Sequence, residues 1–480
     1  MKYPPSKYQK DIFRQFETTS NDMLIQAVAG SGKSSTIIEL SHRAAGKNLF
    51  LAFNKAIADE TKEKVPTYVE SLTLHSLGCK AIYRKFGGNI TVNKNKTYLF
   101  IKKRIEKWKV PYKEIAGTYV NITRLVDIYR MTLCQTQEEL TDTAADMGVV
   151  IKKQQIEWAL EIIGDLQQYN NRFPKIIDFT DMVYLPAINP TILLPDYDNV
   201  FIDECQDLNN AQHTLVERLT RKARAIYVGD RFQSIYGFAG SNTASFERIK
   251  QRKGIVEMPL SVCYRCPLRV LDHANKVYDI LEPREDVIRG EVRTGFLSEA
   301  TDGDMIICRN LKPLILAYFT LILEEKKAFI RGKDLGEGLI ALAKPYEGGS
   351  INNLLKGLRE DLDDKYQVLL ERGVPKPLKH PSYIALSEQI GCLIFIAGKY
   401  QSVREIITLL EGMFDDNTKK GILLCTIHKA KGLEADTVFF LNKHLIPSRY
   451  ATTEEQLEQE RNLEYVAITR AKKKLIYVKI

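Results

Sequence analysis

Residues 23–43 read MLIQAVAGSGKSSTIIELSHR, an apolar run that passes through a turn with two glycines into a pattern of helical period. In a strand-to-helix loop of this kind, backbone N–H groups at the start of the helix can surround phosphate groups. The Lys33 ammonium would reach the β- and γ-phosphates of a nucleotide, and the Ser34 hydroxyl would bind Mg²⁺. Such loops usually begin with glycine, where this chain has Ala27, and the alternative interpretation is a chance glycine-rich turn.

The segments around this loop alternate between short apolar runs and helical patterns. NLFLAFN (48–54) is strand-like, KAIADETKEKV (55–65) is helical, and VESLTLHSLGCKAI (69–82) combines both. The strand pattern returns in NVFIDE (199–204) and RAIYVGD (224–230), where each apolar run ends in acidic residues. This alternation predicts a parallel sheet covered by helices, with the acidic ends of its strands directed into a site.

A second α/β unit begins near residue 251 and includes the apolar runs DMIICRN, GILLCTIH, DTVFFLN and KLIYVKI. Two regions without strand alternation predict helical insertions, and the first of them carries both tryptophans, Trp108 and Trp158. The expected division is an N-terminal domain at 1–86 and 176–250, a helical insertion at 87–175, a C-terminal domain at 251–338 and 401–480, and a small second insertion at 339–400.

Composition excludes several classes of protein. The 480 residues carry a net charge of +9 with 44% hydrophobic residues, unlike a disordered chain or a small disulfide-stapled module. No apolar stretch approaches the roughly 20 residues of a spanning helix, and the N-terminus lacks a signal peptide's apolar core, so we expect no membrane partner and a cytoplasmic protein. A pI near 8.9 makes a polyanionic partner plausible but does not separate nucleic-acid binders from other enzymes. Cys263 and Cys266 are the one close cysteine pair, and without a second pair they do not predict a zinc site.

The run VFIDE (200–204) is the partner that a phosphate-binding loop requires. An apolar strand ending in Asp-Glu supplies one carboxylate, Asp203, to hold Mg²⁺ and a second, Glu204, to polarise the attacking water. Either residue alone would be interpreted as an acidic strand end facing solvent. Together with the loop, the pair predicts nucleotide hydrolysis with Mg²⁺ as a cofactor.

The residues after these strands narrow the class. DECQD (203–207) continues into NNAQ (209–212), and VGD (228–230) continues into RFQSIYGFAG (231–240). Here the chain resembles the UvrD/Rep/PcrA family of superfamily 1 DNA helicases. The remaining family motifs follow in family order: Gln9, LAFNK (51–55), TLHS (73–76), DFTDM (178–182), CYR (263–265), TIHKAKGLE (426–434) and YVAITRA (465–471). The AFNKAIA and TLHSL spellings look closest to the F-box DNA helicase branch and its small viral and bacterial relatives.

The resemblance implies an α/β fold of two RecA-like parallel-sheet P-loop domains, each with a mainly helical insertion. It implies that Gln9 reads the adenine, Tyr264 stacks on it, Gln233 senses the γ-phosphate, and Arg265 and Arg470 act as arginine fingers from the second domain. Outside their motifs, these arginines would be interpreted as surface salt-bridge partners. The implied catalytic residues are Lys33, Asp203, Glu204, Gln233, Arg265 and Arg470. The implied ATP-binding residues are Gln9, Ala29, Gly30, Ser31, Gly32, Lys33, Ser34, Ser35, Tyr264, Arg265, Glu434 and Arg470, with Ser34 and Asp203 as Mg²⁺ ligands.

A motor on nucleic acid needs aromatic faces on which bases stack and polar groups that follow phosphates, a combination that tolerates any sequence. The implied stacking platforms are Phe53, Tyr236 and Phe238, although aromatic residues of α/β proteins are often part of the core. The implied phosphate or sugar contacts are Asn54, Lys55, Thr73, His75, Thr426 and His428. His428 fits a relay between the DNA and ATP sites as well as a direct contact.

Three features depart from the family pattern. Ser35 stands where close relatives often carry an arginine that sandwiches the adenine, and Ala239 replaces the arginine of an FRGA-like turn. The chain also ends at Ile480, one strand after Arg470, whereas UvrD-like enzymes continue into a hairpin that splits the duplex. ATPase activity and translocation are therefore stronger expectations than strong unwinding.

The resemblance implies an ATP-dependent 3′–5′ DNA helicase and single-stranded DNA translocase, with hydrolysis in the cleft between the two RecA-like domains. Its expected partners are single-stranded DNA, single/double-strand junctions and a protein of replication or recombination, and a viral protein of this kind would act in the host cytoplasm. Three alternatives stay open: a translocase that strips proteins or recombinase filaments from DNA with little unwinding, a catalytically silent DNA-binding module, and an α/β ATPase of unrelated purpose. A fused nuclease is disfavoured because no length remains for it after the last motif.

Overall fold

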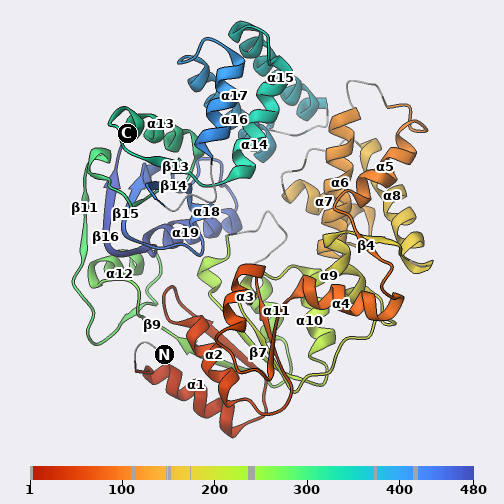
Figure 1. Ribbon diagram of the computed structural model, residues 1–480, viewed down its shortest axis with the longest axis vertical. Helices are drawn as coiled ribbons and strands as arrows, with labels where there is room; N and C mark the ends of the chain where they lie inside the picture. The colour runs from red at the N-terminus through yellow and green to blue at the C-terminus, as the bar shows by residue number, and fades with distance from the viewer. Residues whose placement is uncertain are drawn as a thin grey trace. The chain divides into compact units, whose positions relative to one another are not determined.

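The computed structural model (Figure 1) describes residues 4–110, 115–147, 149, 153–172, 174–235, 244–371, 374, 376–414 and 420–480. The chain forms two compact units, which are described separately below. The first comprises Met1–Ala27 and Gly32–Leu260, and the second comprises Val28–Ser31 and Ser261–Ile480. Among the described residues, no helix combines the length and the apolar character needed to cross a membrane.

The first unit is built on a sheet of six parallel strands in the order β3-β2-β6-β7-β1-β8. Its strands are β1 (Met23–Ala27), β2 (Asn48–Ala52), β3 (Val69–Thr73), β6 (Asn199–Ile202), β7 (Arg224–Gly229) and β8 (Val256–Leu260). Its helices are α1 (Lys7–Thr18), α2 (Lys33–Arg43), α3 (Lys55–Lys62), α4 (Leu74–Phe86), α9 (Phe179–Ile188), α10 (Asn210–Leu219) and α11 (Ala244–Lys250). The predicted parallel α/β sheet is confirmed.

Both faces of this sheet are apolar because helices cover both. Along β1, Met23 and Ile25 pack into one core with α1 and α2, whereas Leu24 packs into a second core with α10 on the opposite face. Side chains alternate across a strand, so a strand buried on both faces is apolar at most of its positions; in β1 only Gln26 is polar. This explains the predominantly apolar runs of the sequence. Because β8 pairs with β1 from Met23 opposite Val256 to Ala27 opposite Leu260, the first unit extends past residue 250, the boundary expected from the sequence.

The first insertion has its own hydrophobic core, formed by residues such as Ile122, Leu125 and Ile162. Its helices are α5 (Lys96–Ile105), α6 (Ile115–Thr132), α7 (Gln137–Asp146) and α8 (Lys153–Arg172), and in Figure 1 they gather beside α4, α9 and α10. Trp108 and Trp158 stack there with ring centroids 5.0 Å apart. A small parallel pair, β4 (Thr91–Val92) and β5 (Ile176–Ile177), joins the two ends of the insertion. Strands of two residues are too short to show any alternation, so the sequence does not predict them.

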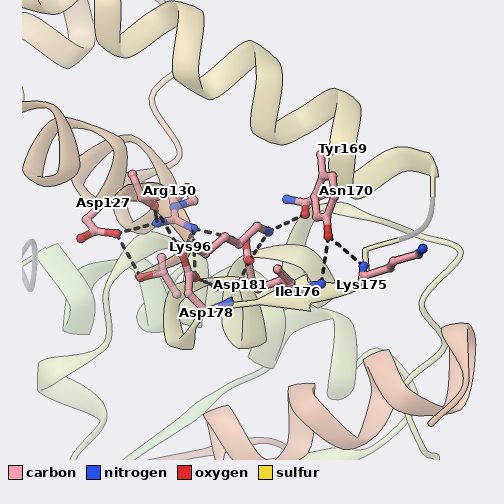
Figure 2. Close-up of polar contacts among 11 residues, drawn as sticks. Lys96, Asp127, Arg130, Tyr169, Asn170, Lys175, Ile176, Asp178 and Asp181 are labelled. Atoms are coloured by element: carbon pink, nitrogen blue, oxygen red, sulfur yellow. Dashed lines mark hydrogen bonds and ion pairs between the residues drawn. The ribbon is translucent and has the colours of Figure 1, made fainter. Parts of the chain in front are cut away.

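A buried cluster of charged side chains fastens the insertion to the sheet domain (Figure 2). The Lys96 ammonium of α5 lies 2.5 Å from an Asp181 oxygen, and Arg130 of α6 donates to both oxygens of Asp178 at 2.9 and 3.0 Å. Arg130 Nη1 also contacts Asp181 at 3.2 Å, so the four side chains form one network. Asp178 and Asp181 belong to the DFTDM segment, where they form a capping box at the start of α9.

The cluster is almost completely removed from water. Lys96 and Asp181 are fully buried, and Arg130 and Asp178 are 3% and 5% exposed. Amide and carboxylate groups at its edge complete the bonding: the Asn170 side chain of α8 accepts from Lys96 at 2.7 Å, and Asp127 accepts from Arg130 at 2.7 Å. Helices α5 and α6 therefore bond directly to Asp178 and Asp181 at the start of α9, and α8 joins the network through its bond to Lys96. Such a network specifies one geometry of docking, because any other arrangement would leave a buried charge unpaired.

The second unit contains a second sheet of six parallel strands, in the order β11-β16-β15-β12-β14-β13. Its strands are β11 (Glu291–Thr294), β12 (Met305–Cys308), β13 (Ala328–Ile330), β14 (Ile422–Thr426), β15 (Ala435–Leu441) and β16 (Ala471–Val478). The four runs quoted from the sequence become β12, β14, β15 and β16. The two six-stranded parallel sheets confirm the predicted fold class.

The second insertion is part of the core of the second sheet. Helices α14 (Lys333–Ala343), α15 (Ile351–Glu371), α16 (Pro381–Ala397) and α17 (Val403–Met413) occupy and flank the expected insertion at 339–400, and α16 packs with α13 (Leu311–Leu323). One continuous cluster joins Leu358 and Leu393 of the insertion to Ile306 and Leu424 of the sheet. The region from 339 to 400 is thus helical, as expected, but it shares its hydrophobic core with the domain into which it is inserted.

We expect Arg130→Met to lower the free energy of unfolding of the insertion by about 3–5 kcal/mol, because it leaves Asp178 and Asp181 buried without sufficient positive charge. Urea denaturation followed by tryptophan fluorescence measures this directly, since both tryptophans lie in the insertion. Arg104→Met is the matched control: Arg104 pairs with Asp165 at 2.7 Å, but both side chains are 28% exposed, so its loss should cost at most about 1 kcal/mol. Equal losses in the two variants would contradict the role assigned to the buried cluster.

Candidate active site and nucleic-acid interface

The predicted phosphate-binding loop lies between the end of β1 and the start of α2. Gly30 and Gly32 have φ angles of +69° and +81°, in the left-handed region that favours glycine. Gly32 occupies the N-cap position of α2, so the first N–H groups of that helix face the loop. Ser34 and Ser35 lie exposed in the first turn of α2, whereas the Ser31 hydroxyl is buried without a hydrogen-bond partner among the described residues. The loop therefore has the backbone conformation that a phosphate-binding site requires.

The predicted catalytic lysine and the predicted water-activating glutamate meet in the structure. The Lys33 ammonium lies 2.9 Å from both carboxylate oxygens of Glu204. Glu204 follows β6 in the left-handed conformation, with φ +51° and ψ +43°, which few residues other than glycine adopt and which often marks a functional position. The Gln206 side-chain amide also donates to Glu204. The sequence predicted that Lys33 and Glu204 act in the same site, and in the structure their side chains are in direct contact.

Asp203 and Asp230 add two buried carboxyl groups to the same edge of the sheet. Asp203 is 5% exposed and Asp230 is fully buried. Burial and the neighbouring Glu204 raise the pKa of Asp203, and Lys33 opposes them. Burial likewise raises the pKa of Asp230 to about 6, against the opposing effects of Lys33 and of the Gln233 amide, which donates to Asp230 at 2.6 Å. Burial lowers the pKa of Lys33, but the carboxylates outweigh it and the net pKa is raised.

Sequence reasoning did not assign a role to Asp230. The sequence carries part of the signal, because both apolar runs end in acidic residues, but only the structure shows that β6 and β7 are neighbours in a parallel sheet. The carboxyl ends of adjacent parallel strands meet at one edge of a sheet, where α/β proteins bind ligands. Gln206 bridges the two strand ends, since its carbonyl oxygen accepts from the Asp230 N–H at 3.0 Å and its amide donates to Glu204.

The predicted adenine-reading residue lies beside the loop. Gln9 in α1 is 3% exposed, and its amide nitrogen is 3.6 Å from the position that a Cβ atom would take on Gly32. That amide donates to the Thr36 hydroxyl at 2.9 Å, and its carbonyl oxygen accepts from the Ser6 N–H at 2.9 Å. Gln9 is therefore held in place by α1 and α2 before any base is bound.

Ser34 and Asp203 fit the needs of a magnesium ion. Mg²⁺ prefers oxygen ligands and is usually held by one or two protein side chains together with the phosphates of a substrate, whereas an all-protein cage is uncommon. In the described residues, no cluster of three or more histidine, cysteine, aspartate or glutamate side chains could hold a metal ion by itself. A hydroxyl at the start of α2 and a carboxylate after β6 match the sparse donor set that this ion uses.

The second unit brings its own predicted nucleotide residues together. Arg265 Nε lies 2.7 Å from a Glu434 carboxylate oxygen, and Arg265 Nη1 donates to the Thr469 carbonyl at 3.4 Å. The adjacent Arg470 is 1% exposed and donates to the backbone carbonyls of Val466 and Leu433 at 2.9 and 3.2 Å. The two predicted arginine fingers thus lie on one local network, and Arg470 is anchored more deeply than a surface arginine would be.

Loop residues Val28–Ser31 group with the second unit by their contacts. The Tyr264 N–H donates to the Gly30 carbonyl at 2.8 Å, and the Ala29 N–H donates to the Tyr465 hydroxyl at 3.0 Å. Tyr264, the predicted adenine-stacking residue, is half-buried. Tyr465, the first residue of the motif YVAITRA, therefore contacts the phosphate-binding loop. The sequence alone did not predict this contact.

Several predicted nucleic-acid contacts lie at the carboxyl ends of parallel strands. Phe53 follows β2 and is 44% exposed, as a stacking platform must be. The next residue, Asn54, caps α3 by accepting from the Ile57 N–H at 2.9 Å, and Lys55 is exposed. Thr73 is the last residue of β3 and caps α4 through the Ser76 N–H at 3.1 Å. Tyr236, Phe238 and Ala239 lie outside the described residues.

Two further predicted contacts are histidines, and both are half-buried. Burial lowers the pKa of His75, and burial together with Arg309 and Lys429 lowers that of His428 to about 3. Both rings are therefore neutral at pH 7 and would contact a nucleic acid by hydrogen bonding without adding charge. Thr426 is the last residue of β14 and caps the short helix α18 (Ile427–Ala430) through the Lys429 N–H at 3.4 Å. In this structure the side chains of Asn54, Thr73 and Thr426 are therefore engaged in capping the helices that follow them.

The raised pKa of Asp230 predicts how stability depends on pH without nucleotide. Because the folded protein holds the Asp230 proton to about pH 6 and the unfolded chain releases it near 3.8, this carboxyl favours folding most below pH 4, and its contribution is lost as the pH rises through 6. We expect Asp230→Asn to remove that loss, which is on the order of 3 kcal/mol. Urea unfolding of both proteins by circular dichroism between pH 4 and 7 measures the difference. Parallel pH profiles for wild type and variant would contradict it.

Comparison with known proteins places the chain in a family. The UvrD/REP helicase N-terminal domain matches residues 8–253, and the UvrD-like helicase C-terminal domain matches residues 396–480. DNA helicase II of Rickettsia typhi is 24% identical, over 95% of this chain and 89% of that protein. ATP-dependent DNA helicase PcrA of Staphylococcus aureus is 24% identical, over 96% of this chain and 81% of that protein. F-box DNA helicase protein 1 of Schizosaccharomyces pombe is 23% identical over 94% of this chain, which spans about half (55%) of that relative. Since the N-terminal family domain alone covers more than half of its length, this chain belongs to the UvrD/REP helicase family.

Proposed function

We propose that this protein is an ATP-dependent 3′–5′ DNA helicase and single-stranded DNA translocase. The observation that carries the proposal is the meeting of Lys33, Asp203, Glu204 and Asp230 at the carboxyl edge of the first sheet, beside a loop with two left-handed glycines. The family relationship supports DNA as the polymer on which the enzyme acts. Curated relatives are named DNA helicase II and ATP-dependent DNA helicase PcrA.

The geometry supports a specific order of events in hydrolysis. Phosphate oxygens entering the loop offer Lys33 a second anionic partner, so its ammonium moves away from Glu204. The released Glu204 carboxylate then accepts a proton from the attacking water, as a general base does. Mg²⁺, when bound, neutralises charge on the phosphates, with Ser34 and Asp203 as its protein ligands. Gln233 is held next to this site by Asp230 and can report whether the γ-phosphate is present.

Two residues of the second unit complete the proposed chemistry. Arg265 and Arg470 would neutralise the charge that develops on the γ-phosphate as it leaves, the role of an arginine finger. Their guanidinium groups are held by Glu434 and by backbone carbonyls, which fixes their direction. Binding and release of ATP would change the separation of the two units and so move the protein along DNA, like other hinge-driven ATPases. Single-stranded DNA, its junctions with duplex and a replication or recombination protein stay the proposed partners.

A second candidate is a translocase that strips proteins from DNA with little duplex unwinding. The second insertion favours it, because these helices share the core of the second sheet and do not form a separate body that could divide a duplex. Both candidates share the ATPase cycle and the track on single-stranded DNA. They differ in strand displacement, which the following experiment measures.

We expect single-stranded DNA to stimulate ATP hydrolysis, and a duplex with a 3′ tail, but not one with a 5′ tail, to be opened. Glu204→Gln should bind ATP yet hydrolyse it about 10²–10⁴-fold more slowly, because it removes the general base and keeps the size of the side chain. ATPase assays and strand-displacement gels provide both measurements.

Three outcomes of those assays separate the proposals. Stimulation without displacement would select the translocase. Opening of the 5′-tailed duplex alone would reverse the proposed polarity. No stimulation by DNA would contradict both motors.

Phe53→Ala should weaken binding of single-stranded DNA by about 1–3 kcal/mol, because it removes one exposed ring on which a base can stack. Fluorescence anisotropy with labelled oligonucleotides measures the affinity, and ATPase activity without DNA should stay unchanged. Phe296→Ala is the matched control, since Phe296 is 75% exposed and belongs to no predicted contact. Equal losses of affinity, or no loss in either variant, would remove Phe53 from the proposed DNA track.

A further inference from the structure

A chain of hydrogen bonds links two helices to the turn that follows the proposed general base, Glu204. The Ser245 hydroxyl of α11 donates to the Cys205 carbonyl at 2.7 Å, and Nε2 of His213 in α10 lies 2.8 Å from the same hydroxyl. His213 and Ser245 are 4% and 3% exposed, and Cys205 is fully buried. Neither His213 nor Ser245 is among the residues predicted to contact nucleotide or DNA. Polar groups buried this deeply are hydrogen-bonded as a rule, and here their bonds lead to the active site.

The direction of these bonds follows from the chemistry of the three groups. A carbonyl oxygen only accepts, so the Ser245 hydroxyl donates its single hydrogen to Cys205. The Nε2 atom of His213 must then donate to the serine oxygen, which places the ring hydrogen on Nε2. Burial and Arg248 lower the pKa of His213 to about 3, so the ring is neutral at pH 7. The bonds therefore run from His213 through Ser245 to Cys205, and each polarises the next.

The Cys205 carbonyl belongs to the peptide group that joins Cys205 to Gln206. The orientation of this peptide group determines where the Gln206 side chain begins, and that side chain is 1% exposed. Its amide donates to Glu204, and its carbonyl oxygen accepts from the Asp230 N–H at 3.0 Å. The bond from Ser245 thus acts on the Glu204 carboxylate through one intervening residue.

Strand β7 also limits where this turn can lie. A Cβ atom on Gly229 would lie 2.4 Å from Gln206 Oε1 and 2.8 Å from Cys205 Sγ, so strand and turn are closely packed. Glu204 itself has a left-handed backbone with φ +51°, a conformation that surrounding contacts must maintain. Small shifts of the turn would therefore reach the carboxylate that is expected to accept a proton from water.

We propose that His213 and Ser245 are positioning residues, which orient the Cys205–Gln206 peptide group and through Gln206 keep the Glu204 carboxylate aligned for its reaction with water. The effect on hydrolysis rests on the proposed function of Glu204, whereas the hydrogen bonds do not.

The fold should survive removal of the Ser245 hydroxyl. Phe246 and Ile249 of α11 lie in the same hydrophobic core as Cys205 and hold the helix without help from Ser245. The Leu208 N–H also reaches the Cys205 carbonyl, at 3.4 Å, so this carbonyl keeps a donor in the variant. Changes in activity can therefore be measured on folded protein.

We expect Ser245→Ala to lower kcat for DNA-stimulated ATP hydrolysis by on the order of tenfold, because a misplaced general base removes the proton less effectively. KM for ATP should change by less than about twofold, since the phosphate-binding loop is not altered. Ser41→Ala is the matched control: the buried Ser41 hydroxyl also donates to a backbone carbonyl, that of Ile38 at 2.6 Å, but within a single helix. An unchanged kcat in Ser245→Ala would overturn the proposal.

A double-mutant cycle separates positioning of Glu204 from a general loss of structure. In Glu204→Gln the proposed base is absent, so adding Ser245→Ala should leave the slow remaining hydrolysis unchanged in single-turnover assays. A merely structural role would lower the rate by the same factor with and without the Glu204 carboxylate. That result would overturn the proposal.

Two substitutions of His213 test the first bond of the chain. His213→Gln offers an amide N–H near the place of Nε2 and should keep most of the wild-type kcat. His213→Leu fills a similar space without a donor and should behave like Ser245→Ala. Equal kcat values in the two variants would contradict the role of the His213 N–H.

Failure of the proposed function is visible separately, as absence of DNA-stimulated hydrolysis in the wild-type protein. In that case hydrogen exchange of the Asp230 N–H replaces turnover as the measurement, because this N–H is bonded to Gln206. Exchange that is faster in Ser245→Ala than in wild type and Ser41→Ala supports the control of Gln206 by Ser245. Equal exchange in all three proteins contradicts it.

Discussion

An excess of buried negative charge controls the candidate active site. Asp203, Glu204 and Asp230 share one nearby ammonium, that of Lys33, and removing ions from water costs several kcal/mol each. The protein reduces this cost by raising the pKa of both aspartates and by directing the Gln206 and Gln233 amides at the carboxylates. A site with this balance admits an anionic nucleotide only together with further cations. The proposed Mg²⁺ ion and the proposed arginine contacts would supply those cations, in agreement with the charge of the site and with the chemistry of phosphoryl transfer.

The polar side chains predicted to contact DNA already perform a structural task. Asn54, Thr73 and Thr426 each cap a helix that follows a parallel strand. An N-cap is worth about 1 kcal/mol, so a phosphate that takes over the capped N–H or the capping oxygen competes with the helix itself. Contacts of this kind are individually weak and easily exchanged. The proposed translocase would release DNA at every step, and weak contacts suit such a cycle better than tight pockets would.

Sequence patterns predicted the two sheets because strands buried on both faces are apolar at most of their positions, and they predicted Lys33 and Glu204 because the motif spacing requires both. They did not reveal Asp230, since its role depends on which strands are neighbours in the sheet. Neither could they reveal the bonds of Lys96 to Asp181, which join residues 85 positions apart in sequence. The sequence predicted a boundary near residue 250, before β8. Only the pairing of β8 with β1 shows that this strand belongs to the first sheet.

The continuous core of the second unit makes its inserted helices indispensable to the fold. Leu358 and Leu393 cover apolar surface that belongs to the sheet as much as to the insertion. A shortened protein that kept the six strands but lacked α14–α17 would expose this surface to water, and large exposed apolar patches lead to aggregation. The first insertion, in contrast, has a separate hydrophobic core of its own. The helices of the second insertion are part of the domain itself, so polar substitutions there should be tolerated only at their solvent-facing positions.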